Sequence, residues 1–499
     1  MTWARYVLLL TVLVLITLHT SLQFGFWKDD WMSVWYGIYQ PASLLNGWMH
    51  PAANFEYFFL GRLLNDNVFL WQRMGLVLRF FAALSVARFG ATLFRSRKAG
   101  VVAGILFATT VIGMDAATWT SAYVSLVVVI FLSLGFHYWI SYLRNTSIPL
   151  CITAITLLLI ACISDVWRVL WFIPLLQYTV WMESKSALRK RLMKKFYWIY
   201  GISLLVLPIC IKISWPIISD MQIVHFVSQH WFKPTVLVSG LMYAGNFFNS
   251  LFYMIVGWII HLPEEGTVGV HSRWQAYMGL GLVIFSVVYI VYARLTRRTR
   301  QLLGLLLIWI LGFYVSNWLF QPRLVFGVSH RFQAISGVGF VLFLTWIIVK
   351  IRNSFIAVTL TILIVLLNIC ASWRILTEQL TYRSDTVIRK SWDVVDKEVS
   401  RTSGPAALYF VGDGSVYYNV FALSGSAPLA LYRGYAHMSQ FPVVAYDMKN
   451  LAYFVCNDHA GYHRIPVDRI YAWHVKENVL IPIHEEVRSR VIADWCMVE

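Results

Sequence analysis

A chain of 499 residues that is 59% hydrophobic and only 13% charged is not composed like a soluble protein, which carries roughly twice that charged fraction. The formal net charge of +17 raises the question of a nucleic-acid partner, but the basic residues are gathered in short loops between apolar runs. Such loops mark the cytoplasmic side of a membrane protein, so the charge indicates topology and we predict no nucleic-acid partner. The basic loops are "RSRK" (95–98), "ESKSALRKRLMKK" (183–195), "ARLTRRTR" (293–300) and "KIR" (350–352).

Apolar runs of about 17–25 residues recur along the chain, each long enough to cross roughly 30 Å of hydrocarbon. Arg5 precedes the first run and no small-residue cleavage site follows it, which predicts an uncleaved signal anchor. With the basic loops inside, this first span runs outward and the C-terminus lies outside. The sequence predicts about eleven spans, at 5–24, 68–93, 99–114, 121–142, 148–163, 166–182, 196–213, 276–292, 301–319, 335–350 and 354–373.

The first outer loop, 25–67, opens with "GFWKDDWMSVWYG", in which two adjacent carboxylates, Asp29 and Asp30, follow a membrane span. A charge at this position is costly unless it faces water or a partner. The pair either carries function or caps a short interfacial helix over "WMSVWYGIY". Because neighbours on a helix point about 100° apart, one carboxylate can serve each purpose.

A second outer segment, 214–275, must cross the membrane an even number of times to reach the next basic loop. Its apolar part, about 235–262, is too short for two crossings at a rise of about 1.5 Å per residue. We therefore predict an interfacial or re-entrant segment, which a membrane protein tolerates where the segment lines a cavity.

Residues 375–499 are richer in charge and contain no run of span length, so we predict a small outer α/β domain. "SDTVIRKSWDVVDKEVS" has a helical pattern, and "AALYFV" followed by "GDG" indicates a strand and an ordinary turn. His459 and His463 are more simply surface histidines than metal ligands. Cys456 and Cys496 pair only if the domain faces an oxidising compartment, which the sequence leaves open.

Polar residues gather at the outer ends of the predicted spans, and carboxylates and arginines on one face suggest a cavity that handles an anionic substrate by acid–base chemistry. Two simpler readings stay open. Asp165 and Arg168 are three residues apart and can neutralise one another, and His330 and Arg331 can lie at the interface and snorkel. The outer set is Asp29, Asp30, His50, Glu56, Arg62, Asp115, Asp165, Arg168, Arg323, His330 and Arg331.

Four segments, taken in order, are similar to GT-C glycosyltransferases. "KDDW", "MHP" and the run 54–89 resemble the acidic pair, first outer loop and second span of that superfamily, and 95–129 resembles its next unit. "ACISDVWRVLWFIPLL" (161–176) lies where relatives have a Lys-Glu pair, with Asp165 matching the acid. "SHRFQAISGVGFVLFL" (329–344) looks like the Arg-aromatic stretch before a late span. His50-Pro51 stands where relatives have Arg-Pro, and Ser164 stands where they have Lys.

The resemblance, which is nearest to the protein O-mannosyltransferases, implies a GT-C-like catalytic domain over 1–374 with the outer domain attached. Such enzymes pass a sugar from a polyprenyl-phosphate carrier to a glycan, lipid or protein acceptor on the non-cytoplasmic face, here of the plasma membrane. The donor phosphate would suit Arg331, His330, Arg168 and Arg323, and Asp29, with Asp30 beside it, would act on the acceptor hydroxyl. The remaining substrate-binding candidates are His50, Glu56, Asp115, Asp165, Trp27 and Trp31.

No metal or other cofactor is expected, because the phosphate leaves already attached to its lipid and arginines can supply the positive charge. A divalent cation held by Asp29, Asp30 and Asp115 stays open. Two other functions also stay open: a transporter or flippase of lipid-linked saccharide, and a membrane scaffold whose outer domain binds a partner. A transporter should show ionisable residues near mid-membrane, whereas these acids lie at outer span ends.

Overall fold

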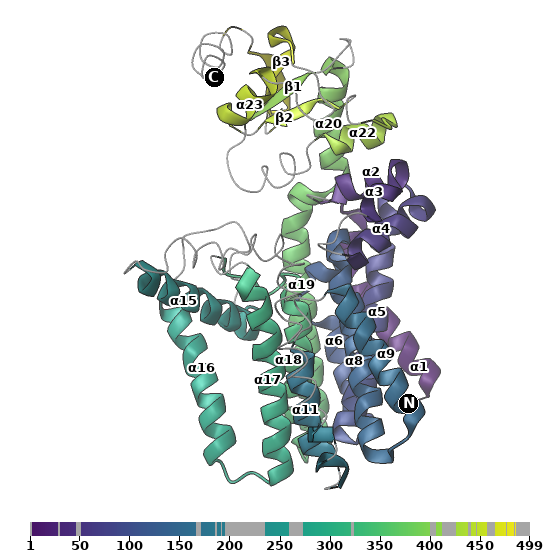
Figure 1. Cartoon of the computed structure of the whole chain (residues 1–499), viewed down its shortest axis with the longest axis vertical. Helices are drawn as coiled ribbons and strands as arrows, with labels where there is room; N and C mark the ends of the chain where they lie inside the picture. Colours follow the sequence, from purple (N-terminus) through teal and green to yellow (C-terminus); the bar gives the residue numbers. More distant parts are fainter. Residues whose placement is uncertain are drawn as a thin grey trace. The chain divides into compact units, whose positions relative to one another are not determined.

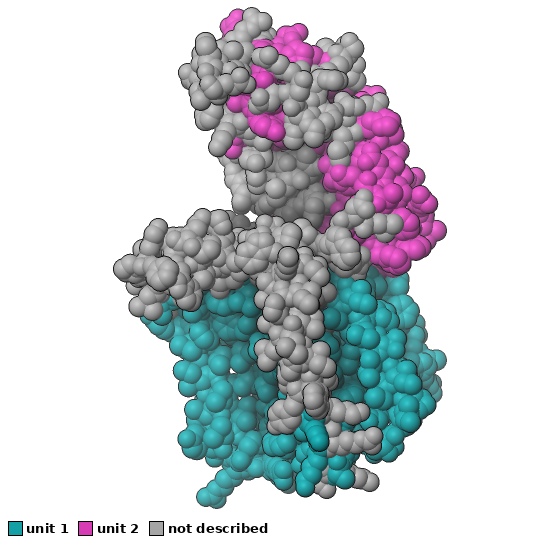
Figure 2. All heavy atoms as spheres, in the orientation of Figure 1, with its two compact units in different colours: residues 1–19, 75–118, 122–374 teal, residues 20–74, 119–121, 375–499 magenta. Residues whose placement is uncertain are grey.

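The computed structural model describes residues 2–27, 30–45, 51–165, 171–184, 187–190, 192–194, 235–258, 273–320, 324–399, 406–411, 426–437, 441–445, 447–456, 465–475, 477–483 and 485. The chain divides into two compact units, which Figure 2 shows in different colours. Unit 1 comprises residues 1–19, 75–118 and 122–374, and unit 2 comprises residues 20–74, 119–121 and 375–499.

Helices make up the described part of unit 1 (Figure 1). Helices α5 and α19 each have residues in both units. The helices are α1 (Trp3–Leu18), α5 (Val68–Phe94), α6 (Arg97–Thr109), α7 (Asp115–Thr118), α8 (Tyr123–Asn145), α9 (Ile148–Ser164), α11 (Phe172–Glu183), α15 (Thr235–Val256), α16 (Arg273–Tyr292), α17 (Arg297–Phe320), α18 (Gln333–Lys350) and α19 (Ser354–Arg383).

Within the described ranges, seven helices are long and apolar enough to cross a membrane, which makes this a multi-pass membrane protein. They lie at 3–23, 68–94, 120–145, 274–292, 297–319, 333–350 and 354–383. Each coincides with a predicted span. The total of eleven is not confirmed.

Three predicted spans correspond to shorter helices. The helix α6 has 13 residues and ends at Thr109, before a turn that contains Gly113. The helices α9 and α11, with 17 and 12 residues, replace the predicted pair at 148–182. The predicted span at 196–213 lies outside the described residues.

The apolar segment predicted to be interfacial or re-entrant contains the helix α15, Thr235–Val256, which has 22 residues. Figure 1 shows α15 running across the end of the α16–α17 pair, whereas α16, α17 and α18 run side by side along the bundle. The interfacial or re-entrant position of this segment stays a prediction.

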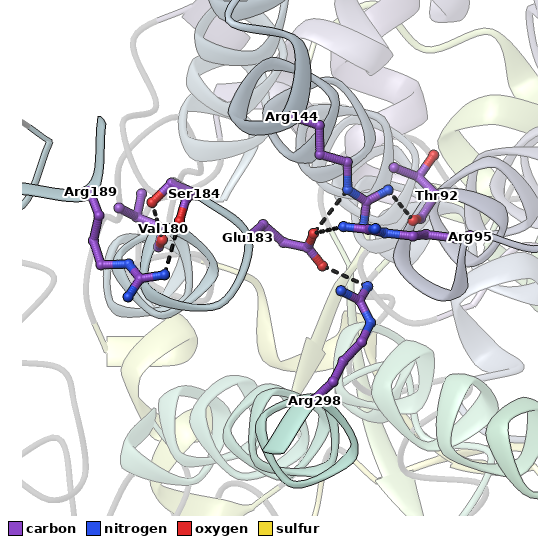
Figure 3. Close-up of polar contacts among 8 residues, drawn as sticks. All are labelled: Thr92, Arg95, Arg144, Val180, Glu183, Ser184, Arg189 and Arg298. Atoms are coloured by element: carbon purple, nitrogen blue, oxygen red, sulfur yellow. Dashed lines mark hydrogen bonds and ion pairs between the residues drawn. The ribbon is translucent and has the colours of Figure 1, made fainter. Parts of the chain in front are cut away.

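Three of the four basic loops predicted to share one side of the membrane, at 95–98, 183–195 and 293–300, meet at one end of unit 1. The carboxylate of Glu183 pairs with Arg95 at 2.9 Å and with Arg298 at 3.0 Å, so residues from three separate loops converge (Figure 3). This confirms their common side and leaves open which compartment they face.

Unit 2 begins with the first outer loop, which folds into α2 (Asp30–Tyr39), α3 (Pro41–Leu45) and α4 (Pro51–Leu64). The helices α2 and α4 pack closely at two glycines, Gly37 and Gly61. A Cβ atom on Gly37 would lie 2.4 Å from the backbone oxygen of Tyr57, so a larger residue would push the helices apart.

The C-terminal part of unit 2 is the α/β domain expected from the sequence. Its four-stranded sheet has the order β2-β1-β3-β4, with β1 parallel to β2 and β3 and with β4 antiparallel to β3. The predicted helix and strand are confirmed as α20 and β1; "GDG", His459 and His463 lie outside the described residues. The elements are α20 (Asp385–Val399), β1 (Ala407–Val411), α22 (Ala427–Arg433), β2 (Val443–Ala445), α23 (Met448–Cys456), β3 (Ile470–His474) and β4 (Val479–Pro482).

Helices cover both faces of this sheet. Ala407 and Ile470 on one face pack in a core with Leu451 of α23, and Trp473 on the other face stacks on Trp392 of α20 at 4.6 Å. Cys456 is disulfide-bonded, and the partner proposed from the sequence, Cys496, lies outside the described residues.

The α/β domain packs on the first outer loop within unit 2. The indole nitrogen of Trp35 in α2 donates to the backbone oxygen of Tyr435 at 2.6 Å, and Trp31 contacts Tyr432 edge-to-face at 5.6 Å. The segment that carries the acidic pair is therefore held by the C-terminal domain as well as by its own loop.

Candidate functional site

Asp30 is the most completely bonded of the predicted site residues. Its side chain is buried at 1% exposure, and its Oδ2 accepts from the Trp27 backbone amide at 3.0 Å. Its Oδ1 accepts from the Ser121 backbone amide at 2.8 Å, from the Tyr57 hydroxyl at 3.1 Å, and from the Ser121 hydroxyl.

These bonds give Asp30 a structural role, but none of these four donors is an amide of α2, so they do not cap that helix. Asp30 is the first residue of α2, and its own amide donates to the Trp27 carbonyl at 2.9 Å, which closes a reciprocal turn. The side chain therefore ties this turn to Tyr57 and Ser121. Asp29, the other carboxylate, lies outside the described residues.

Glu56 on α4 is a second shielded acid in the same region of unit 2. Its Oε1 is buried with no hydrogen-bond partner among the described residues. Burial, and in second place the negative charge of Asp30, raises the pKa of Glu56 well above its ordinary value. Asp30 and Glu56 thus lie near enough for the charge of Asp30 to act on Glu56.

The two predicted tryptophans are packed against other side chains of unit 2. Trp27 lies under the Arg383 guanidinium at 4.8 Å and beside Tyr382 at 5.6 Å. Trp31 is 1% exposed, so in this structure it is a core residue, and the prediction that it offers a surface for sugar or isoprenoid is not supported. Trp27, at 9% exposure, is nearly as buried.

In unit 1, Asp115 lies against the segment that contains His330 and Arg331. The Asp115 amide donates to the Ser329 carbonyl at 2.9 Å, and the Ser329 hydroxyl lies 3.4 Å from Asp115 Oδ2. Gly113 donates to Val328 at 2.9 Å. The fold therefore joins two predicted site segments that are more than 200 residues apart in the sequence.

Gly113 makes this approach possible. Its φ of +66° is in the left-handed region, and a Cβ atom there would lie 2.4 Å from the Ala334 backbone. Both the dihedral angle and the lack of space require glycine at this position.

His330 and Arg331 are placed by aromatic contacts. The His330 ring contacts Phe326 and Phe332, each at a centroid distance of 4.7 Å, and is 4% exposed. The two phenylalanine rings also contact each other at 5.2 Å, so the three rings form one cluster. Its Nδ1 accepts from the Phe332 amide at 3.2 Å, so in the neutral ring the proton lies on Nε2. The Arg331 guanidinium lies 5.2 Å from the Phe332 ring.

Asp165 ends α9, and its amide donates to Ala161 at 3.2 Å. Its side chain is 5% exposed. The alternative of neutralisation by Arg168 is untested, because Arg168 lies outside the described residues. His50 and Arg323 lie outside them as well.

Sequence reasoning missed Arg79, a buried cation within the second span. Its side chain is 1% exposed, donates to the Thr110 carbonyl at 2.5 Å and lies over the Phe107 ring at 4.5 Å. The helix α6 ends at this carbonyl, so the guanidinium caps the segment that leads to Gly113 and Asp115. The signal was available in the sequence as an arginine inside an apolar run.

An apolar cavity of about 440 Å³ lies among α15, α16, α17 and α18. Its walls include Leu251 of α15 and Phe340 of α18. The neighbour of Leu251, Ser250, accepts from the Phe326 amide at 2.8 Å, and its carbonyl accepts from Gln333 at 3.3 Å. The helix that lines the cavity is therefore fastened to the segment that carries His330 and Arg331.

No protein-family model matches this sequence, and no curated protein matches it. Among solved structures, the chain is similar to the archaeal oligosaccharyltransferase AglB from Archaeoglobus fulgidus in complex with an inhibitory peptide and a dolichol-phosphate, with 13% identity and a TM-score of 0.42. It is similar in the same way to this oligosaccharyltransferase tethered to an acceptor peptide, with 13% identity and a TM-score of 0.43, and to its apo form, with 11% identity and a TM-score of 0.42.

These matches cover 82% of this chain and 62–63% of the solved chains, so the chain spans less than two thirds of their length. These solved neighbours are oligosaccharyltransferases by name. At these TM-scores the likeness decides nothing about the chemistry of this chain.

Proposed function

We propose that the chain is a GT-C type glycosyltransferase that moves a sugar from a polyprenyl-phosphate carrier to an acceptor hydroxyl on the non-cytoplasmic membrane face. The proposal rests on the residues of unit 1 that suit an amphipathic anion and on the acidic pair that opens α2.

One observation carries the proposal: the helix that lines the apolar cavity is bonded to the segment that bears a histidine and an arginine. An isoprenoid chain needs an apolar channel, and its phosphate needs a donor that can bind two oxygens at once. The bond between Ser250 and Phe326, at 2.8 Å, links these two requirements within unit 1. In this proposal the carrier chain enters the cavity and Arg331 holds the phosphate.

The reaction assigned to the site is a displacement at the anomeric carbon of the sugar. Asp29 takes the proton of the acceptor hydroxyl, and the acceptor oxygen forms the new glycosidic bond from the face opposite the phosphate. The bond between the anomeric carbon and the phosphate oxygen breaks, and polyprenyl phosphate leaves with the electron pair. Arg331 and the Nε2–H of His330 would stabilise the charge that develops on this phosphate.

Asp30 supports Asp29 in this proposal rather than sharing its role. The bonds from Trp27, Tyr57 and Ser121 hold Asp30, the first residue of α2, in place. In this proposal Asp30 therefore contributes to the stability of the loop and Asp29 to the chemistry.

The disulfide at Cys456 supports an outer location for the α/β domain, because disulfides persist in oxidising compartments. We place the protein in the plasma membrane with the site and this domain outside. Mannose is the first sugar to test, following the resemblance to protein O-mannosyltransferases, with peptide, glycan and lipid acceptors.

A transporter of lipid-linked saccharide is the second candidate, and buried Arg79 is the residue that would favour it. Arg79 Nη2 donates to Thr110 and the guanidinium lies over Phe107, while its Nε and Nη1 are buried with no partner among the described residues. The enzyme remains our first proposal, because the candidate acids lie at the outer ends of the predicted spans and not near mid-membrane.

Binding of polyprenyl phosphate to the purified protein tests whether the apolar cavity and the segment with His330 and Arg331 serve one ligand. Arg331→Ala should weaken binding by roughly 1–3 kcal/mol, because a charge-assisted bond to phosphate is lost. Leu251→Trp should also weaken it by filling the cavity. Arg352→Ala, at the basic end, is the matched control and should leave binding unchanged. Equal binding by all four proteins would contradict the proposal.

A further inference from the structure

The basic end of unit 1 holds three arginines around one glutamate (Figure 3). Glu183 at the end of α11 accepts from Arg95 Nη2 at 2.9 Å, Arg144 Nε at 2.9 Å and Arg298 Nη2 at 3.0 Å. Its side chain has no exposed area. Burial alone would raise the pKa of Glu183, but the bonds and charges of the three arginines lower it, so the carboxylate is ionised at neutral pH.

The charges in this cluster do not cancel. Three guanidiniums face one carboxylate, so the cluster has a net charge of two positive. Glu183 is the only acidic residue in the basic loops at 95–98, 183–195 and 293–300. The side chains of Arg95 and Arg298 are 55% and 48% exposed. Nη2 of Arg144 is buried and has no partner among the residues that the structure describes. The cluster therefore has both the charge and a spare donor for an anion.

The cluster lies at the level where a membrane has its headgroups. Arg95 follows the candidate span 68–94 directly, Arg144 is next to the end of 120–145, and Arg298 is the second residue of 297–319. Guanidiniums at the ends of three spans reach the phosphate layer, where an anionic lipid is present at far higher local concentration than a soluble anion. This position favours a lipid over free phosphate.

We propose that Arg95, Arg144 and Arg298 form a binding site for the phosphate of an anionic phospholipid headgroup, with Glu183 as the fixed counter-charge that holds the guanidiniums together. Planar guanidinium groups bind phosphate through two parallel bonds. Arg144 also donates to the Thr92 carbonyl of α5 at 2.7 Å, so a lipid here would tie α5, α8, α11 and α17 together. The site is independent of the proposed glycosyl transfer.

The test compares the full-length protein in nanodiscs of phosphatidylcholine alone and with added phosphatidylglycerol. We expect phosphatidylglycerol to raise the unfolding temperature of the wild type and to remain bound in native mass spectrometry. The double variant Arg95→Gln/Arg298→Gln should lose this rise and retain roughly tenfold less phosphatidylglycerol. Arg352→Gln, a span-end arginine outside the cluster, should behave as the wild type.

Glu183→Gln separates a lipid site from a purely structural ion cluster. This variant should be less stable than the wild type in phosphatidylcholine, because three guanidiniums then repel one another. Phosphatidylglycerol should raise its unfolding temperature more than that of the wild type, because the lipid phosphate replaces the lost carboxylate. If Glu183→Gln gains no more than the wild type, the cluster is structural and the proposal is overturned.

Two further outcomes would also overturn it. If Arg352→Gln loses as much phosphatidylglycerol as the double variant does, the lipid is attracted to the basic surface in general and not to this cluster. Inorganic phosphate that stabilises the detergent-solubilised protein as much as the lipid does would mean a site for a soluble anion. If the double variant fails to fold, the single variant Arg298→Gln is compared by mass spectrometry, with reduced lipid retention expected and unchanged retention contradicting the site.

Discussion

Two adjacent carboxylates, Asp29 and Asp30, have the same chemistry and different surroundings. Asp30 accepts hydrogen bonds from Trp27, Tyr57 and Ser121 and is buried. A carboxylate in this position stabilises the loop, and the proposed base is its neighbour. Substitution of Asp30 should therefore lower stability, whereas substitution of Asp29 should lower turnover.

Asp30→Asn should lower the free energy of unfolding by about 1–3 kcal/mol. The amide group of Asn places a donor against the Trp27 amide or against the Ser121 amide, whichever way it turns, so one buried donor stays unsatisfied. Chemical unfolding in detergent measures this loss. Ser121→Ala should show a smaller loss, because the Ser121 backbone bond remains. An Asp30→Asn variant as stable as the wild type would contradict the structural role.

Glu56 should make stability fall as pH rises. Its pKa is raised in the folded protein, so above about pH 4.5 the unfolded chain releases the proton first, and unfolding becomes easier as pH increases towards the folded-state pKa. Glu56→Gln removes this effect and should raise the unfolding temperature at pH 7 relative to the wild type.

The difference in unfolding temperature between Glu56→Gln and the wild type should shrink as the pH is lowered through about 4.5 and vanish below it, where both states hold the proton. Thermal unfolding across this pH range measures it. A Glu56→Gln variant that is less stable at pH 7 than the wild type would mean that the ionised carboxylate has a partner in the folded protein.

At the scale of the elements, the turn between α6 and α7 positions Asp115 against Ser329. Gly113→Ala should destabilise the protein by at least about 1–2 kcal/mol, the usual cost of a left-handed residue with a side chain, and by more because of the contact with Ala334. It should also lower turnover by displacing the His330 segment. Gly281→Ala in α16 is the control, since a Cβ atom there meets nothing within 4 Å.

Unfolding and turnover of both glycine variants should be measured together. Gly281→Ala should be neutral or slightly stabilising, by up to about 1 kcal/mol, because alanine favours a helix. Equal stability for the two variants would mean that the turn at Gly113 is not constrained as the structure indicates.

Length and hydropathy were sufficient to predict the seven helices that are long and apolar enough to span. They failed for α6, α9 and α11, because helix ends set by Thr110 or Asp165 depend on tertiary contacts more than on hydropathy. The strand β1 was predicted from its apolar run. The strand β4 was not predicted, although its sequence VLIP is also apolar.

The candidate site could be predicted only in part. Chemistry selected Asp115 and His330 as candidates, but the packing of Asp115 on Ser329 is a contact between loops more than 200 residues apart, which one sequence does not reveal. The burial of Trp31 was likewise invisible, because an aromatic loop residue can face sugar or core. The contact of Arg79 with the end of α6 could be recognised only from the structure.

At the scale of the whole molecule, the proposal requires the first outer loop and the α/β domain to share the non-cytoplasmic side. Single cysteines at the exposed positions Arg62 and Thr386 should react with an impermeant thiol reagent added to intact cells. A cysteine at exposed Thr296, in a basic loop, should react only after the cells are permeabilised. The parent protein gives the background from native cysteines. Labelling of Thr296→Cys in intact cells would reverse the orientation.

Release of polyprenyl phosphate from polyprenyl-phosphate mannose by the purified protein, in the presence of acceptor, tests the central claim most directly. The account predicts release with matching transfer of the sugar, continued activity in chelator, and a fall of about 10²–10⁴ in turnover for Asp29→Asn with donor binding nearly intact. Near-normal turnover in folded Asp29→Asn, or loss of turnover in chelator restored by magnesium or manganese, would contradict the assigned mechanism. If no polyprenyl phosphate is released with any sugar or acceptor tested, the proposal that the protein is a glycosyltransferase is contradicted.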